Sequence, residues 1–151
     1  REMTGRMWAA LIAAGWLWVL LQASFHGDPD DWFIVSQIHV DDIAPGTEPI
    51  IQYERTIKQE FRGNWTVELN EVTPGGFMVA CSGSGSNNYK PTDRKPIDAT
   101  LSYFIGKICP IEAGKAYSID VIWTIRPPGV PPMEVERTSN EFKMVAAPER
   151  P

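Results

Sequence analysis

The chain has 151 residues, enough for one domain, and its 43% hydrophobic and 22% charged residues are typical of a folded protein rather than a disordered one. Its net charge of −5, without an extended basic stripe, argues against nucleic acid as a partner. The 13 prolines and 12 glycines indicate many turns and few long helices.

The first predicted element is a helix over residues 7–25, none of which carries a formal charge. A helix of that length spans about 28 Å, close to the hydrocarbon thickness of a bilayer. We therefore predict an uncleaved transmembrane helix between an N-terminal segment at 1–6 and a linker at 26–32. The alternative is a signal peptide cut after Ala23, but Leu21 would then occupy a position where a small residue is usual.

Charges on either side of this segment predict its orientation. Arg1 and Arg6 precede it, whereas three aspartates follow it and the next basic residue is Arg55. Because basic residues remain on the cytoplasmic side, we expect the N-terminus in the cytoplasm and residues 33–146 outside it, in the periplasm if the protein is bacterial. The predicted location is a cell inner membrane, with the lipid bilayer as one partner.

Small residues recur at four-residue spacing in the predicted helix: Ala9 with Ala13, and Ala10 with Ala14, followed by Gly15. In lipid, a face of small side chains lets another helix approach closely. The spacing therefore predicts helix packing against an integral membrane protein complex. The alternative is chance, because alanine is common in membrane anchors.

Alternating polarity replaces the helical pattern after residue 32. Trp65, Val67 and Leu69 share one face of a predicted strand, and the alternate residues from Tyr117 to Ile125 share another. Seven short strands with turn signals between them predict an all-β sandwich over residues 33–146, followed by a tail at 147–151. The predicted strands lie near 33–40, 50–58, 64–72, 77–81, 97–105, 116–125 and 133–145.

The segment IEAGKAYSIDV, residues 111–121, resembles the corner between the E and F strands of fibronectin type III and other immunoglobulin-like domains. The resemblance implies a seven-strand immunoglobulin-like sandwich in which Gly114 makes the turn and the Tyr117 hydroxyl bonds to the backbone as a tyrosine corner. Trp65 and Trp123 are the other expected structural residues. Since Trp65 precedes both cysteines, the inter-sheet disulfide of antibody domains is not expected. The fold itself implies no activity.

Cys81 and Cys109 are the only cysteines of the chain. Outside the cytoplasm a lone pair is more often bonded than free, so we predict a disulfide. Strict alternation of strand direction would put the two cysteines near opposite ends of the sandwich. The bond therefore requires residues 106–115 to fold back.

The same alternation puts the loops after the second, fourth and sixth strands on the membrane side. These loops are 59–63, 82–96 and 126–132, and long loops on a rigid sandwich commonly carry recognition. The alternative is a flexible loop in solvent and a rigid proline turn. The predicted partner-facing residues are Asn87, Tyr89, Lys90, Arg94, Lys95, Arg126, Pro128 and Val130.

The sequence predicts no catalytic, cofactor or metal site. Of the two histidines, His26 falls in the linker and His39 has no nucleophile beside it. Neither cysteine is followed by the histidine of a copper site, and SGSGSNN lacks the lysine of a phosphate-binding loop. His26 with the nearby aspartates could hold a hard cation, the alternative being a solvated acidic linker. Asn64 is formally a glycosylation acceptor.

These observations predict a non-catalytic accessory or assembly subunit of a larger membrane protein complex. One helix would anchor it, and the outer sandwich would dock on the partner. The alternative is a membrane-tethered extracytoplasmic module that binds a ligand, a glycan or a cell-wall component, including one of phage origin. An enzyme is the third and least supported interpretation.

Overall fold

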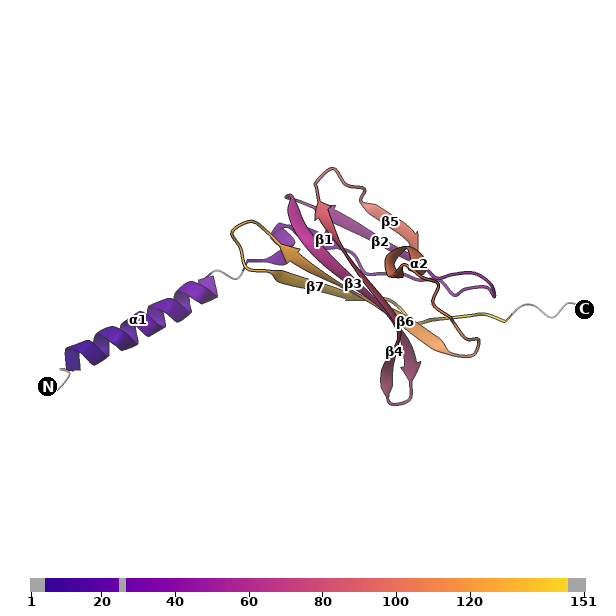
Figure 1. The fold of residues 1–151 in the computed structure, drawn as a ribbon, viewed down its shortest axis with the longest axis horizontal. Coiled ribbons are helices and arrows are strands. Elements are labelled where there is room, and N and C mark those ends of the chain that lie inside the picture. Colours follow the sequence, from indigo (N-terminus) through magenta and orange to yellow (C-terminus); the bar gives the residue numbers. More distant parts are fainter. Residues whose placement is uncertain (1–4, 25–26, 147–151) are drawn as a thin grey trace, which may run out of the picture.

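The computed structural model describes residues 5–24 and 27–146, and it consists of one long helix followed by a β-sandwich (Figure 1). Helix α1 (Gly5–Ser24) covers almost all of the predicted helix. Within the described residues, no helix has the combined length and hydropathy of a membrane-spanning segment. Residues 1–4, Phe25, His26 and the predicted tail at 147–151 lie outside the described part of the chain.

Two antiparallel sheets form the domain and confirm the prediction of an all-β sandwich. The first sheet has the order β1 (Phe33–Val35), β2 (Ile50–Ile57), β5 (Pro96–Thr100). The second has the order β4 (Gly76–Tyr89), β3 (Phe61–Thr73), β6 (Ala116–Arg126), β7 (Met133–Thr138), and β8 (Phe142–Lys143) pairs with the start of β6. A short helix, α2 (Leu101–Ile105), follows β5.

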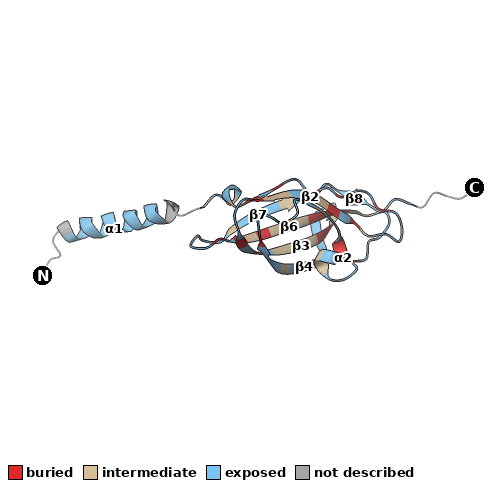
Figure 2. Cartoon of the chain, turned by 90° about the horizontal axis from the view of Figure 1, so that it is seen from above, coloured by how far each residue is buried: buried red, intermediate tan, exposed pale blue. Residues whose placement is uncertain are grey.

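Alternation along β6 fills the core as expected. Tyr117, Ile119, Val121, Trp123 and Ile125 are all buried and belong to the core cluster, and the buried segments of the sandwich contrast with the exposed helix α1 (Figure 2). On β3, Val67 and Leu69 are fully buried, whereas Trp65 is half-buried at the edge of the core. The inner faces of β3 and β6 therefore form the centre of the domain.

Several predicted strand limits are wrong. The fourth strand is β4, which continues through residues predicted as the loop 82–96, so only 90–95 connect it to β5. The segment 97–105 ends as helix α2, and 133–145 divides into β7 and β8. Residues 33–40 form a three-residue strand and an isolated bridge at His39. The described residues thus contain eight strands instead of seven.

The predicted linker at 26–32 is packed on the sandwich where it is described. It contains the 3-10 turn η1 (Pro29–Asp31), and the carbonyl of Trp32 accepts a hydrogen bond from the amide of Lys58 at 2.9 Å. Trp32 is half-buried against the core. The domain therefore begins close to the end of α1.

The disulfide between Cys81 and Cys109 is confirmed, with Cα atoms 6.1 Å apart. Cys81 lies opposite Leu69 inside β4, near the end of the sandwich that holds the β3–β4 hairpin. The predicted fourth strand ended at Cys81, whereas β4 continues to Tyr89, so Cys81 lies near the start of β4, at the end of the sandwich where β5 finishes and Cys109 follows. The length of β4 therefore removes the conflict that strict strand alternation had raised, and the expected fold-back of residues 106–115 is not the reason.

The turn before β6 has the predicted geometry. Gly114 adopts a φ of +84°, a value that favours glycine. The backbone amide of Glu112 donates a hydrogen bond to the Tyr117 hydroxyl at 3.0 Å. The hydrogen bond from Glu112 to the buried Tyr117 side chain therefore holds the turn against the core.

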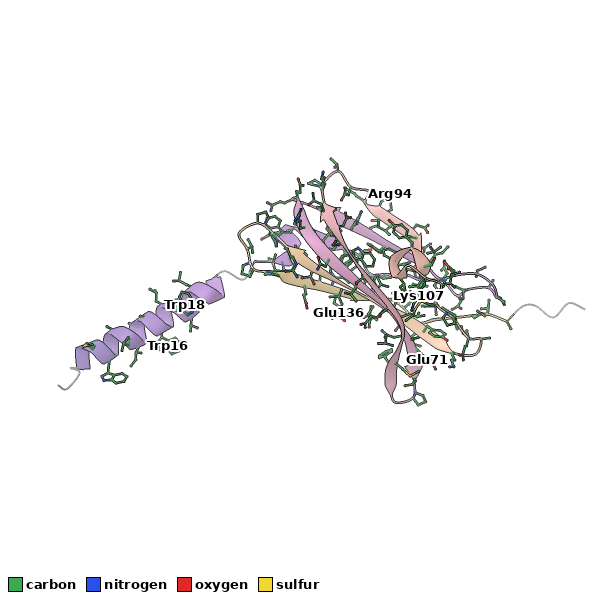
Figure 3. The ribbon with its side chains drawn as sticks, in the orientation of Figure 1. Trp16, Trp18, Glu71, Arg94, Lys107 and Glu136 are labelled. Carbon is green, nitrogen blue, oxygen red and sulfur yellow. A yellow bond between two sulfur atoms is a disulfide. The ribbon has the colours of Figure 1, made fainter. Side chains whose placement is uncertain are left out.

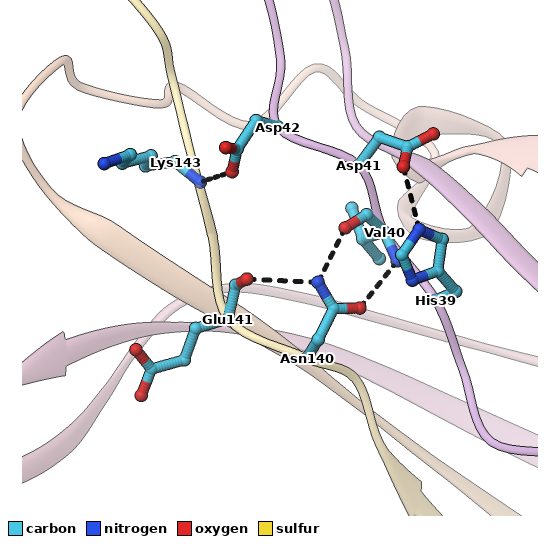
Figure 4. A network of polar contacts seen from close by, with 7 residues as sticks. All are labelled: His39, Val40, Asp41, Asp42, Asn140, Glu141 and Lys143. Atoms are coloured by element: carbon cyan, nitrogen blue, oxygen red, sulfur yellow. Dashed lines mark hydrogen bonds and ion pairs between the residues drawn. The ribbon is translucent and has the colours of Figure 1, made fainter.

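Along one side, the segment after β1 is joined to the segment after β7 (Figure 4). The Asn140 side chain accepts a hydrogen bond from the Val40 amide at 3.0 Å and donates one to the Val40 carbonyl at 2.8 Å. The amide of Lys143 donates to the Asp42 carboxylate at 2.9 Å. We call this the closed side of the sandwich. On the opposite, open side, no strand pairing joins β4 to β5 among the described residues.

Candidate functional site

Three loops meet at one end of the sandwich, as the sequence predicts. Phe61 lies opposite Tyr89 and Arg62 lies opposite Arg126, so the start of β3 is beside the ends of β4 and β6. We call this end the proximal pole; it comprises residues 27–32, 58–60, 90–95 and 127–132. An ideal Cβ on Gly27 would lie 3.0 Å from Val130, so the chain enters the domain at this pole.

The predicted partner-facing residues divide between surface and core. Lys90, Arg94, Lys95, Arg126 and Pro128 are exposed, and Val130 is half-buried. Asn87 is exposed but belongs to β4 instead of a loop. Tyr89 is 2% exposed and stacks on Phe61 with ring centroids 4.9 Å apart, so its expected role on the surface is wrong. An aromatic residue near the end of a strand is often buried, and the predicted short strand concealed this.

The loop 90–95 is fastened to β2 through Arg55. The Arg55 amide donates to the Lys95 carbonyl at 2.9 Å, and its Nε donates to the Arg94 carbonyl at 3.1 Å. The side chain of Arg94 remains exposed on the loop (Figure 3). This loop therefore presents its cationic side chains from a fixed backbone.

Arg62 and Arg126 lie in register on neighbouring strands and line a polar hollow of about 520 Å³ on the outer face. Both are exposed, and neither forms an ion pair with the described residues. Like charges directly opposite on adjacent strands repel each other. An acidic group from another molecule would relieve this repulsion.

Helix α1 leaves its apolar side chains uncovered. The predicted packing residues Ala9, Ala10, Ala13, Ala14 and Gly15 are all exposed, as are Trp16 and Trp18 (Figure 3). The large apolar side chains are 46% to 65% exposed and surround the helix: Met7, Trp8, Leu11, Ile12, Trp16, Leu17, Trp18, Val19, Leu20 and Leu21. The sandwich therefore does not bury α1.

A second candidate site, which the sequence does not predict, is a cavity of about 450 Å³ on the open side. Tyr53 and Arg55 of β2 line it from one sheet, and Trp65, Tyr89 and Trp123 line it from the other. The residues of α2 at its rim, Tyr103 and Phe104, belong to a segment predicted as a strand. A signal for this cavity existed in the aromatic residues on β2 and α2, but their convergence depends on the tertiary fold.

Burial changes the acidity of two tyrosines at this cavity. Desolvation raises the pKa of Tyr53 from 10.0 to about 12, although the nearby Arg55 cation acts in the opposite direction. The pKa of Tyr89 is raised too, mainly by burial. Both hydroxyls are therefore protonated and able to donate hydrogen bonds at neutral pH.

Within the described residues, no group of three or more His, Cys, Asp or Glu side chains could hold a metal ion. The predicted cation site at the linker includes His26, which lies outside those residues. Asn64 is exposed on β3. No protein-family model matches the chain, and no curated protein is significantly similar to it in sequence.

Proposed function

We propose that the protein is a non-catalytic accessory subunit of a membrane protein complex, held by α1 and docked through the proximal pole. The observation that carries this proposal is the apolar surface around α1. A helix that is hydrophobic on every side requires a cover of lipid or of other apolar helices. The small residues of α1, from Ala9 to Gly15, would allow close contact with a partner helix.

The proximal pole supplies a second contact next to the first. It lies where the chain enters the domain, and it presents Lys90, Arg94 and Lys95 on a fastened loop. Arg62 and Arg126, which form no ion pair with residues 5–24 and 27–146, lie beside it and favour an acidic partner surface. Two contacts on one chain raise the effective concentration of the second and fix the orientation of the domain.

The proposed location is a cell inner membrane, with the N-terminus in the cytoplasm and the sandwich in the periplasm or another extracytoplasmic compartment. Arg1 and Arg6 before α1 and the aspartates after it support this orientation. The disulfide supports an oxidising compartment for the domain.

The sandwich is proposed to be of the immunoglobulin-like type. Its support is the bonded Tyr117 hydroxyl and the division of the described strands into antiparallel sheets of three and five, the fifth strand of the larger sheet being the two-residue β8. Because this architecture serves many roles, it carries no argument for the docking function.

Membrane attachment is tested by expressing the full chain and washing the membranes with alkaline carbonate. We expect the protein to remain in the pellet, and its release into the supernatant would contradict the anchoring role of α1. Extraction in mild detergent and native electrophoresis should then show the protein migrating with other membrane proteins. Migration as a monomer would contradict the accessory role.

The contact face of α1 is tested by replacing Ala10 and Ala14 together with leucine. We expect the double variant to stay in the membrane pellet but to lose its co-migrating partner, because larger side chains separate the helices. The matched control replaces Ile12 and Val19 with leucine on the other side of α1, and it should keep the partner. Equal behaviour of the two variants would exclude the small-residue face as the contact.

A second candidate function is a tethered extracytoplasmic module that binds a small ligand, a glycan or a cell-wall component. The cavity on the open side of the sandwich is the observation that favours it.

A further inference from the structure

The cavity on the open side exists because the two sheets are joined unequally. On the closed side, Arg137 Nε donates to the Val35 carbonyl at 3.3 Å, and the Gln37 amide donates to the Thr138 carbonyl. On the open side, α2 and the disulfide cover the half of the gap near the β3–β4 hairpin. The other half, between β2, β5 and the end of β4, remains open as the cavity.

Aromatic rings form most of the cavity wall. Tyr53 and Trp123 meet edge to face with centroids 5.5 Å apart, and Trp65 and Phe104 meet at 90° with centroids 5.6 Å apart. Tyr103, 75% exposed, continues this wall at the rim. Such a wall accepts a flat apolar ring through offset or edge contacts.

Two polar groups in the wall lack protein partners. Tyr53 and Tyr89 are 7% and 2% exposed, yet neither hydroxyl forms a hydrogen bond within the described residues. Both hydroxyls are open to the cavity, since the fully buried side-chain atoms without a partner in the described residues are Ser118 Oγ and Asp120 Oδ1 instead. A ligand in the cavity would supply acceptors for both hydroxyls.

The charge of the wall comes from Arg55. Its guanidinium lies 5.7 Å from the centre of the Tyr89 ring, and it has no ion-pair partner within the described residues. Among the described residues, no Asp or Glu lines the cavity. The site therefore combines one cation, two hydroxyl donors and an aromatic wall.

We propose that this cavity binds a small organic anion with a flat apolar ring, of the aromatic carboxylate class. The carboxylate pairs with Arg55 and accepts hydrogen bonds from the tyrosine hydroxyls, while the ring lies against the wall that Trp65, Phe104 and Tyr103 form together. The volume of about 450 Å³ falls within the range of small-molecule sites. This inference does not depend on the membrane partner.

The test uses the full chain in detergent micelles and isothermal titration calorimetry with 2-naphthoate, compared with its neutral analogue 2-naphthamide. We expect 2-naphthoate to bind at least about tenfold more tightly, because a hydrogen bond to a charged group contributes more than a neutral one. Equal affinity for the two probes, or no binding of 2-naphthoate at millimolar concentration, would overturn the proposal.

Three variants locate the binding. Arg55→Gln should weaken binding of 2-naphthoate about tenfold and leave that of 2-naphthamide unchanged, whereas Lys58→Gln, which removes an exposed charge outside the cavity lining, should change neither. Asn87→Trp, which places a large ring at an exposed position of the rim, should weaken both probes. Unaltered binding in Asn87→Trp would mean that the probe occupies the micelle or another surface, and would overturn the assignment.

Discussion

Gly83 and Gly85 lie within strand β4, where glycine normally weakens a strand. A Cβ on Gly83 would come within 2.5 Å of Ile105 Cα, and a Cβ on Gly85 within 2.4 Å of Trp65 Cζ2. Their small size therefore lets α2 and the Trp65 ring approach β4. The segment SGSGSNN was predicted as a loop because glycine and serine are common in turns, and the sequence alone does not show that these glycines serve close packing within a strand.

Gly83→Ala should destabilise the domain by about 1 to 3 kcal/mol, because the new methyl group meets helix backbone that cannot rotate away. Urea unfolding under non-reducing conditions measures the loss. The matched control is Gly75→Ala in the β3–β4 hairpin, where a Cβ would meet nothing within 4 Å. A loss as large in the control would show that close packing is not the cause.

Tyr53 should make stability depend on alkaline pH. Its pKa in the folded state, about 12, lies above the ordinary value of 10.0, so the folded state keeps a proton that the unfolded state releases. The stabilisation is complete below pH 10 and is lost as the pH rises through 12. The loss amounts to about 2 to 3 kcal/mol for two pKa units.

Urea midpoints at pH 8 and pH 11 measure this effect. Tyr53→Phe should reduce the difference between the two midpoints, since phenylalanine has no proton to release. Tyr103→Phe is the control, because Tyr103 is 75% exposed. An unchanged difference in Tyr53→Phe would assign the alkaline loss to other groups, including Tyr89.

At the scale of elements, long alternating strands were predictable and short irregular ones were not. The pattern from Tyr117 to Ile125 gives the inner face of β6 correctly because each inward residue contributes apolar surface. Helix α2 has only five residues, too few to show a helical period. Because α2 directly follows β5, the sequence pattern predicted one strand that continued through the residues of α2.

Of the two candidate sites, the proximal pole could be predicted from the sequence and the cavity could not. The proximal pole follows from strand alternation, which depends only on the number of strands before each loop. The cavity requires the positions of β2, β4 and α2 relative to one another. No local pattern encodes those positions, so Tyr89 appears as a loop residue in the sequence and as a cavity wall in the structure.

The disulfide should be the strongest single constraint between elements. Cys81→Ala together with Cys109→Ala should destabilise the domain by about 3 to 4 kcal/mol, because the bond closes a segment with a sequence separation of 28 residues. Thermal unfolding measures the change, and reduction of the native protein with dithiothreitol should give a similar loss. A change below about 1 kcal/mol in both experiments would show that other contacts hold α2 against β4.

For the whole molecule, the core and α1 are independent. The core begins at Phe33, and the large apolar side chains of α1 remain exposed. A chain that starts at Gly27 should therefore unfold with the same midpoint as the full chain, measured by circular dichroism in the same detergent. A lower midpoint, by more than about 1 kcal/mol in free energy, would reveal a stabilising contact from α1.

Only residues 25 and 26 separate the end of α1 from Gly27, which already lies against Val130. Even a fully extended backbone would separate the Cα atoms of Ser24 and Gly27 by no more than about 11 Å. A molecule that binds α1 would therefore have the sandwich, described over residues 27–146, directly beside its binding surface. If α1 packs on a membrane partner, as proposed, that partner must leave space for the sandwich next to the end of α1.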